Sequence, residues 1–389
     1  MSVLKFTPIN TNKKNNKYMI CSIIILILLT FILFYIFNPS FRNFITIYIF
    51  RKQVSQDNLT SISLAEDGTS FVYSYDKYIV VLNKNILFTY NASGNLISEQ
   101  DVNISNPIFS SNNRFLAIGE KNGKSLYLLS GENIIWQSNI DGNISKINVN
   151  NNGYISVIVT GTSYKSIVIT YNSKGKEMFK SYLSSTIAID SDISNDNKYL
   201  SIAEIDYSGS IIKSMIKTIS IEKAIEEPTN SVIYIFTADD NSLITDINYQ
   251  NKNLLSCIYS DSIHTLNINE KSDSILINFD NDYDFADINL KNHAITTNSK
   301  SSGFSSSTNV KIHNIQHDNT SIYELNGSIK NLYCYNEKIA INLGSEIHFI
   351  GLNGWLIKKY TSSNEINSIV LGDNIAGVVY KDKIEIIQF

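Results

Sequence analysis

Cysteine and proline are scarce in this chain, which has three cysteines and four prolines among 389 residues. Cys21 lies in an apolar run, whereas Cys257 and Cys334 lie in separate strand-like stretches, so neither a disulfide framework nor a zinc-ligand spacing is present. The sequence leaves open whether Cys257 and Cys334 are oxidised to a single bridge. There is also no Pro-rich or Gly/Ser-rich linker of the kind that separates domains.

Acidic residues are absent from residues 1–56, which hold seven of the 32 Lys and Arg residues. The remainder therefore carries 25 basic against 36 acidic side chains, a net charge of about −11. A strongly acidic domain repels nucleic acid and anionic lipid headgroups, so we expect no nucleic-acid partner.

Charged side chains are also missing from residues 18–37, an apolar run that ends at Asn38-Pro39. Twenty residues of helix span roughly 30 Å, the thickness of a bilayer's hydrocarbon core. No small-x-small cleavage site follows, which favours an uncleaved transmembrane helix over a signal peptide. Four lysines precede the run and three basic residues follow it, so the positive-inside rule makes residues 1–17 a basic cytoplasmic tail. Residues 38–58 are then a juxtamembrane stalk, and residues 59–389 lie outside the cytoplasm.

From residue 59 onward, short runs of Ile, Val, Tyr, Phe and Leu are separated by Asn-Gly, Ser-Gly and Asn-Asn turns, a pattern typical of strands. The stretch 104–138 gives four strands, and the stretch 144–182 matches it step by step. Further units begin near Thr186, Leu243, Asp284 and Ser328. Four short strands every 35–50 residues or so predict an all-β fold, a β-propeller.

The number of blades follows from how the ring closes. The last unit has only three strands, and residues 59–65 form a spare strand without a unit of its own. Pairing the two closes the ring and removes two exposed edges. This gives eight four-stranded blades, with seven as the alternative because the units around 184–236 and 284–325 are degenerate. A helical turn is expected near Ile219–Glu227.

Several segments resemble known repeat families. S-N-D-N-K-Y-L-S-I-A-E (194–204) resembles the strand entry of WD-repeat-like propellers, and I-I-W-Q and W-L-I resemble quinoprotein-type repeats. Together with the tail and anchor, N-G-K-S-L-Y-L and Y-N-S-K-G-K-E-M-F resemble the domain-of-unknown-function family numbered 5711, membrane-anchored propellers of low-GC Gram-positive bacteria. The resemblance is clearest over residues 70–210. It implies the architecture and no activity, cofactor or catalytic residue.

Motifs for chemistry are few. Nucleophile-elbow, metalloprotease and phosphate-loop patterns are absent, so we expect no cofactor and no enzyme. Asp280, Asp282 and Asp284 alternate as in a calcium loop, but Phe285 stands where the turn needs Gly, and a solvated turn is the simpler interpretation. In the predicted innermost strands, Asp246 and Asp287 fall at matching positions, with Asn106 and Lys146 at the same place in other units. These four side chains are candidates for a polar ring around the axis.

The sequence thus predicts a membrane-anchored, extracytoplasmic propeller that acts as a binding or scaffold module of the cell envelope. Its expected partners are the bilayer, through residues 18–37, and an envelope protein or peptide. The alternative is a membrane-tethered hydrolase or lyase that acts on envelope glycan or peptide through carboxylates in the central channel.

Overall fold

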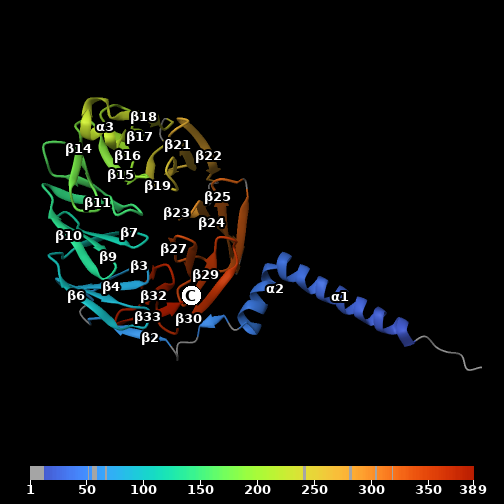
Figure 1. The fold of residues 1–389 in the computed structure, drawn as a ribbon. Helices are drawn as coiled ribbons and strands as arrows, with labels where there is room; N and C mark the ends of the chain where they lie inside the picture. Colours follow the sequence, from blue (N-terminus) through green and yellow to red (C-terminus); the bar gives the residue numbers. More distant parts are fainter. Residues whose placement is uncertain are drawn as a thin grey trace, which may run out of the picture. The chain divides into compact units, whose positions relative to one another are not determined.

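The computed structural model describes residues 13–50, 52–54, 59–65, 68–239, 242–279, 283–302, 305–317 and 319–389. The chain divides into two units, residues 1–53 and 54–389. The first unit contains helix α1 (Lys13–Phe37), helix α2 (Pro39–Phe44) and the π-helical turn η1 (Ile45–Ile49) (Figure 1).

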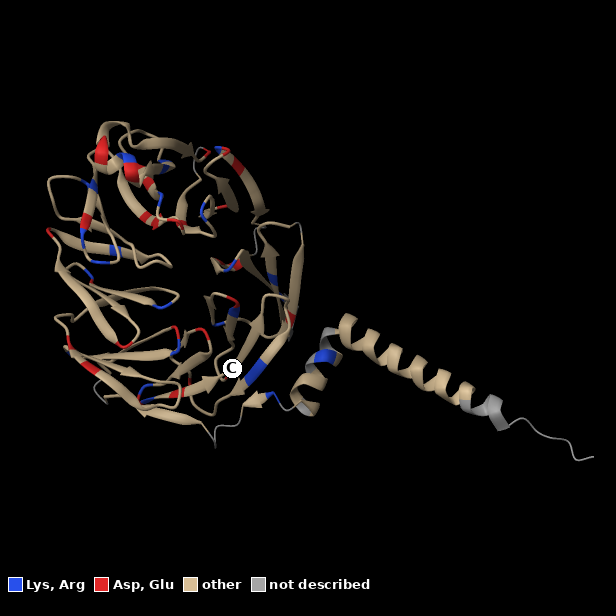
Figure 2. Cartoon of the chain, viewed as in Figure 1, with Lys and Arg blue, Asp and Glu red and all other residues tan. Residues whose placement is uncertain are grey.

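Helix α1 includes the segment Tyr18–Phe37, which has 20 residues and a mean hydropathy of 3.0. This segment carries no charged side chain (Figure 2) and is long and apolar enough to cross a membrane. A signal sequence near an N-terminus has the same properties. The helix ends where the sequence predicts, because Pro39 cannot continue it and the Asn38 side chain caps α2 by accepting the Phe41 N–H at 2.9 Å. Phe41 then packs edge to face on Phe31 of α1.

The second unit is a β-propeller of eight sheets around a common axis (Figure 1), which confirms the larger of the two predicted blade numbers. We number the blades 1–8 in chain order. Blade 1 consists of β3 (Phe71–Tyr75), β4 (Tyr78–Asn83), β5 (Ile86–Tyr90) and β6 (Leu96–Asp101). Blade 2 consists of β7 (Pro107–Asn112), β8 (Phe115–Glu120), β9 (Ser125–Ser130) and β10 (Asn133–Asn139). Blade 3 consists of β11 (Asn143–Val149), β12 (Ile155–Thr160), β13 (Ser166–Tyr171) and β14 (Glu177–Leu183).

Blade 4 differs by a short helical insertion before its last strand. It consists of β15 (Ile187–Ile193), β16 (Tyr199–Asp206), β17 (Lys213–Ser220), helix α3 (Ile221–Glu226), the 3-10 turn η3 (Pro228–Asn230) and β18 (Val232–Thr237). Blade 5 consists of β19 (Ile244–Tyr249), β20 (Leu254–Tyr259), β21 (Ser262–Asn267) and β22 (Ser272–Asn278). Blade 6 consists of β23 (Tyr283–Leu290), β24 (His293–Ser302), β25 (Ser305–Asn314) and β26 (Thr320–Asn326). The helical turn predicted near Ile219–Glu227 is therefore confirmed as α3.

The last two blades each take up a strand from the N-terminal side. Blade 7 consists of β27 (Asn331–Tyr335), β28 (Lys338–Asn342), β29 (Glu346–Gly351) and β30 (Leu356–Thr361), and β1 (Gln53–Val54), whose second residue begins this unit, lies beside β30. Blade 8 consists of β31 (Ser368–Leu371), β32 (Ile375–Val379), β33 (Lys383–Gln388) and β2 (Thr60–Ser63). Ile62 of β2 lies opposite Ile384 of β33, so a strand from the start of the propeller completes its final blade.

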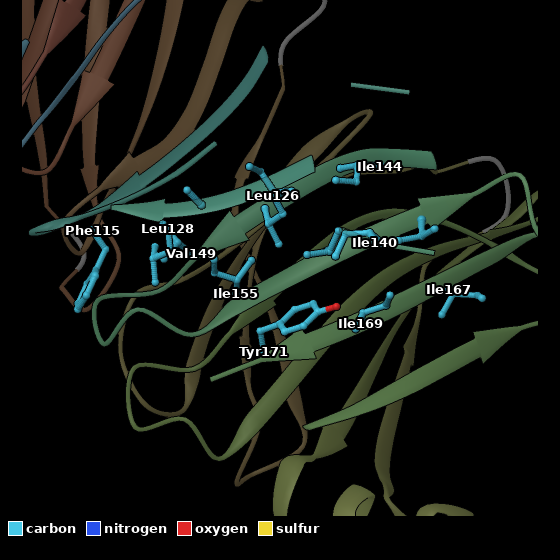
Figure 3. Close-up of a cluster of buried hydrophobic side chains, with 14 residues drawn as sticks. Phe115, Leu126, Leu128, Ile140, Ile144, Val149, Ile155, Ile167, Ile169 and Tyr171 are labelled. Carbon is cyan, nitrogen blue, oxygen red and sulfur yellow. The ribbon is translucent and has the colours of Figure 1, made fainter. Parts of the chain in front are cut away.

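Position within the blade explains why some strands read as continuous apolar runs and others alternate. The middle strands β8 and β12 are buried almost throughout, because adjacent blades pack on both of their faces. The outermost strand β10 instead alternates between exposed and half-buried residues. Figure 3 shows one inter-blade core, in which Leu126 and Leu128 of blade 2 meet Ile155 and Ile169 of blade 3.

Asparagine occupies the turns for two physical reasons. Asn113, Asn122, Asn197, Asn292 and Asn336 adopt positive φ angles between 52° and 60°, a region that Asn tolerates better than most residues. Other asparagines cap turns with their side chains. Asn172, for example, accepts the backbone N–H groups of Lys174 and Lys176 at 3.0 Å each.

Polar contacts between hairpins link neighbouring blades around much of the ring. Asn150 of blade 3 donates to the Ser194 carbonyl of blade 4 at 3.1 Å. Gln250 of blade 5 donates to the Ile288 carbonyl of blade 6 at 2.9 Å, and the Asp373 N–H of blade 8 donates to the Asp76 carbonyl of blade 1 at 2.7 Å. These contacts fix the angle between blades, so the innermost strands hold their side chains in defined positions around the axis.

Candidate functional site

The innermost strands of three consecutive blades share an irregularity at the same point. The register shifts at Ile144/Lys146 in β11, at Ala188/Asp190 in β15 and at Ile244/Asp246 in β19. A bulge re-aims the side chain that follows it. Lys146, Asp190 and Asp246 are thereby brought together from blades 3, 4 and 5.

Lys146 lies between two carboxylates. Its Nζ is 2.9 Å from Asp190 Oδ1 and 3.3 Å from Asp246 Oδ1. The Lys146 side chain is 34% exposed, and those of Asp190 and Asp246 are 3% and 52% exposed. Burial by itself would lower the pKa of Lys146, but the two carboxylates outweigh it and raise that pKa. Lys146 is thus a cation whose charge is neutralised within the propeller.

Asp190 has its hydrogen-bonding capacity filled from three blades. Its Oδ1 accepts from Lys146, from Asn148 Nδ2 at 2.8 Å and from the Ser191 N–H at 2.8 Å, while Oδ2 accepts from the Ile247 N–H at 3.0 Å. Burial raises the pKa of this carboxyl, and Lys146 opposes the rise. The side chain therefore ties blades 3, 4 and 5 together.

Asp192, two residues further along β15, repeats this arrangement without a cation. Its two oxygens accept the N–H groups of Ile193 at 2.8 Å and Tyr249 at 2.7 Å. Burial raises the pKa of Asp192 to about 7, although these hydrogen bonds act in the opposite direction. Asp192 is therefore a carboxyl that titrates near neutral pH inside the fold.

Asp287 lies on the next inner strand, β23, but it is bound mainly to its own turn. It accepts the Asn289 N–H at 2.6 Å, and burial raises its pKa to about 6. Cys334 of blade 7 lies against it, and burial and this carboxyl raise the pKa of the Cys334 thiol. Both Cys334 and Cys257 are free thiols.

Of the four side chains proposed from the sequence, the structure joins Lys146 and Asp246 directly. Asp287 is close enough to Asp246 for that charge to raise its pKa. Asn106 is not part of this group in the described structure: it is exposed, and its N–H points to the Glu120 carboxylate at 3.2 Å. Asn106 precedes a proline and sits before β7 begins, so it lies outside the strand that would place it on the axis.

Sequence reasoning missed Asp190 and Asp192. Aligning A-I-D-S-D-I (188–193) with I-T-D-I-N-Y (244–249) would have placed Asp190 at the position of Asp246. Two acidic residues that are buried in a strand interrupt the expected alternation, which is why this unit looked degenerate.

The proposed calcium loop falls mostly outside the described residues, because Asp280 and Asp282 are not among them. Asp284 is exposed and accepts a hydrogen bond from the Ser299 hydroxyl. Within the described ranges, no group of three or more His, Cys, Asp or Glu side chains is placed to hold a metal ion.

Ser262, His264 and Asp273 on blade 5 have the composition of a catalytic triad. His264 Nδ1 is 2.7 Å from Asp273 Oδ1, and His264 Nε2 is 2.9 Å from Ser262 Oγ. However, Ser262 is buried, with 4% of its surface exposed, and its hydroxyl donates to Asp261 at 3.0 Å. A nucleophile must reach its substrate, so this set stabilises the β21–β22 hairpin rather than attacking a ligand.

An apolar surface lies on blades 3 and 4, on strand β14 and on the β12–β13 and β16–β17 connections. Tyr164, Tyr182, Tyr207, Ile211 and Ile212 are between 39% and 53% exposed, and we call them the blade 3–4 patch. The rings of Tyr164 and Tyr182 are 4.8 Å apart. Lys165 joins the two blades, since its Nζ lies 3.8 Å from the centre of the Tyr207 ring and donates to the Ser185 carbonyl at 2.8 Å.

Fold and site together define an eight-bladed propeller, preceded in the chain by an apolar helix that could span a membrane. The chain belongs to the Family of unknown function (DUF5711), whose sequence model matches residues 51–389. This confirms the resemblance given by the repeat units. No curated protein matches the sequence.

Solved propellers resemble the chain at low identity. BamB from Moraxella catarrhalis matches with a TM-score of 0.47 and 13% identity, over 87% of this chain and 97% of that one. Hydrazine synthase of Kuenenia stuttgartiensis matches with a TM-score of 0.45 and 10% identity, over 86% of this chain and 99% of that one. Apo AztD from Citrobacter koseri matches with a TM-score of 0.47 and 11% identity, over 78% of this chain and 88% of that one. Likenesses this weak carry no information about function.

Proposed function

We propose that this protein is a membrane-anchored binding module whose propeller captures an envelope protein or peptide outside the cytoplasm. The observation that carries the proposal is the blade 3–4 patch. Contiguous exposed apolar side chains on a soluble surface mark interaction sites. Tyrosines are enriched among the residues that dominate binding energy, because they combine a large apolar area with few rotatable bonds.

Lys146, Asp190 and Asp246, which we call the axial cluster, support a module that binds rather than one that catalyses. A channel enzyme needs carboxylates that can exchange protons with a substrate. Asp190 is buried and saturated by hydrogen bonds, and Asp246 shares the Lys146 cation with it. We propose that these groups hold blades 3, 4 and 5 together and that the chain has no enzymatic activity.

The N-terminal unit supports attachment to a bilayer. Residues 18–37 form one uncharged helix, and basic residues flank it on both sides with a small excess before it. We propose that this helix is retained as an anchor, with the N-terminus in the cytoplasm. The acidic balance of the propeller favours protein over nucleic acid or anionic lipid as its partner.

The test is cross-linking of the full-length protein in its native membrane, followed by identification of what co-purifies. We expect a reproducible envelope protein that is lost in the double variant Tyr164→Ser/Tyr207→Ser. The matched control is Ile275→Ser/Ile322→Ser, which removes two exposed apolar side chains from the outer strands of blades 5 and 6. The proposal is contradicted if both double variants capture the partner equally well, or if no specific partner co-purifies at all.

A further inference from the structure

A polar groove lies on the face of blade 2 that carries the connection between its second and third strands. One cavity of about 590 Å³ is lined by Asn85, Asn103, Glu120, Lys124 and Asn139, among others. A second, of about 280 Å³, shares Asn103 and Asn139 with it and extends to Tyr127 and Gln137. The larger volume is within the usual range of small-molecule sites, roughly 300–1,000 Å³.

The backbone around the groove is fixed by hydrogen bonds. Tyr127 Oη accepts the Asn103 N–H at 2.9 Å, and the Lys124 carbonyl accepts the Ile140 N–H at 2.8 Å. The Glu120 carboxylate accepts the N–H of Ser105 at 2.7 Å and its hydroxyl at 2.9 Å. The groove is thus formed before any ligand arrives, which lowers the entropic cost of binding.

The side chains that face the groove offer more amides than charges. Asn85, Asn103, Asn139 and Gln137 are exposed, and none of their side-chain amides bonds to another residue in the part of the chain that the structure describes. Each amide presents both a donor and an acceptor. Glu120 is already occupied by backbone groups, so Lys124 is the one lining charge that its neighbours leave open among the described residues.

We infer that this groove binds a neutral glycan. Vicinal hydroxyls and acetamido groups both donate and accept hydrogen bonds, as the four amides do. No aliphatic side chain lines either cavity, so an apolar peptide side chain would find no pocket there. The acidic propeller and the near-neutral lining disfavour an anionic polymer. This site is separate from the blade 3–4 patch and does not depend on a protein partner.

The test uses the full-length protein in phosphatidylcholine nanodiscs, since glycoside detergents would compete for the groove. Chitotetraose, cellotetraose and maltotetraose are titrated by calorimetry, with penta-alanine as the peptide probe. We expect saturable binding of at least one oligosaccharide, weakened about tenfold or more in Asn103→Leu/Asn139→Leu, the size expected for two lost hydrogen bonds.

The matched control is Asn278→Leu. Asn278 ends the outer strand of blade 5 opposite Ser262, as Asn139 ends that of blade 2 opposite Ser125, and its loss should leave the affinity unchanged. Thermal unfolding of each variant shows whether it is folded. If the double variant is unfolded, the single variants Asn103→Leu and Asn139→Leu are tested in its place. The inference is overturned if no oligosaccharide binds, if penta-alanine binds instead, or if the groove variants keep wild-type affinity. Loss of the protein partner through the blade 3–4 patch leaves this outcome unaffected.

Discussion

Lys146 is the residue on which the axial cluster depends. Replacing it by Met keeps the length of the side chain and removes the cation that lies 2.9 Å from the buried Asp190. An uncompensated buried charge costs about 3–5 kcal/mol, so we expect Lys146→Met to lower the free energy of unfolding by roughly that amount near pH 8. The penalty should shrink toward pH 4, because Asp190 then takes up a proton. Urea unfolding followed by near-UV circular dichroism measures both values.

Lys291 supplies the matched comparison. It pairs with Glu337 at 2.9 Å, but both side chains are more than half exposed, and such surface pairs contribute about 1 kcal/mol or less. Lys291→Met should therefore change stability little and without a marked pH dependence. If Lys146→Met is as mild as Lys291→Met, the axial cluster does not hold the blades together.

Asp192 makes the stability of the propeller depend on pH. Its pKa is raised by burial from 3.8 to about 7, so the folded state holds a proton that the unfolded state has lost. This contribution is complete below pH 4 and disappears as the pH rises through 7, for a total of roughly 4–5 kcal/mol at about 1.4 kcal/mol per pKa unit. In Asp192→Asn, stability should fall less steeply between pH 4 and 7. Asp190, Asp287 and Asp76, whose pKa values are also raised, contribute to the slope that is left. An unchanged slope would show that Asp192 is ionised in the fold.

At the scale of elements, two hairpin turns allow the strain of a positive φ to be separated from crowding. Gly131 (φ 64°) joins β9 to β10, and Gly175 (φ 77°) joins β13 to β14. A Cβ at Gly131 meets nothing within 4 Å, whereas one at Gly175 meets the Trp136 ring at 2.9 Å. Gly131→Ala should cost about 1 kcal/mol, typical of a left-handed position, and Gly175→Ala should cost more and shift the fluorescence of Trp136. Equal costs in thermal unfolding would mean that Trp136 moves aside freely.

The strand pattern was readable from the sequence because each blade repeats the same local chemistry. The turns Y-N-A-S-G-N-L-I and Y-N-S-K-G-K-E-M-F recur as the β5–β6 and β13–β14 hairpins, where a glycine takes a positive φ. Residues 221–226 gave a helical signal because Ser220 caps them, accepting the Lys223 N–H. Such signals depend on neighbours within a few residues.

The site was only partly readable, because its contacts join residues that are far apart in the chain. Lys146 and Asp246 are 100 residues apart, and only closure of the ring brings them within 3.3 Å. Asp190 carries no local signal of its role, since a buried carboxylate in a strand is unfavourable until three blades supply its donors. The polar groove is hidden from the sequence for the same reason, as its lining comes from strands and connections of blades 1 and 2.

At the scale of the whole molecule, the membrane topology rests on a small difference in charge. Four lysines precede residues 18–37 and three basic residues follow them, so the positive-inside rule favours a cytoplasmic N-terminus narrowly. A Cys introduced at the exposed Ser210, in the loop between β16 and β17, should react with a membrane-impermeant maleimide in intact cells. A Cys at Ser2 should react only after lysis. The wild-type chain gives the background from its own three cysteines, of which Cys257 is fully buried, Cys334 is partly buried and Cys21 lies in the apolar helix.

The reverse labelling pattern would place the propeller in the cytoplasm and remove an envelope partner from consideration. The mass of the purified chain separates the anchor from a cleaved signal, because cleavage after the apolar helix would shorten the protein by about 40 residues. If the chain is uncleaved and Ser210→Cys is labelled in intact cells, the propeller lies at the outer face of the membrane. It is then within reach of the glycans and proteins of the envelope. The groove of blade 2 and the blade 3–4 patch would then be presented together, because both lie at the connections between second and third strands and between blades and at the strand ends beside them. These connections lie on the same face of the ring, so a glycan and a protein could be held side by side.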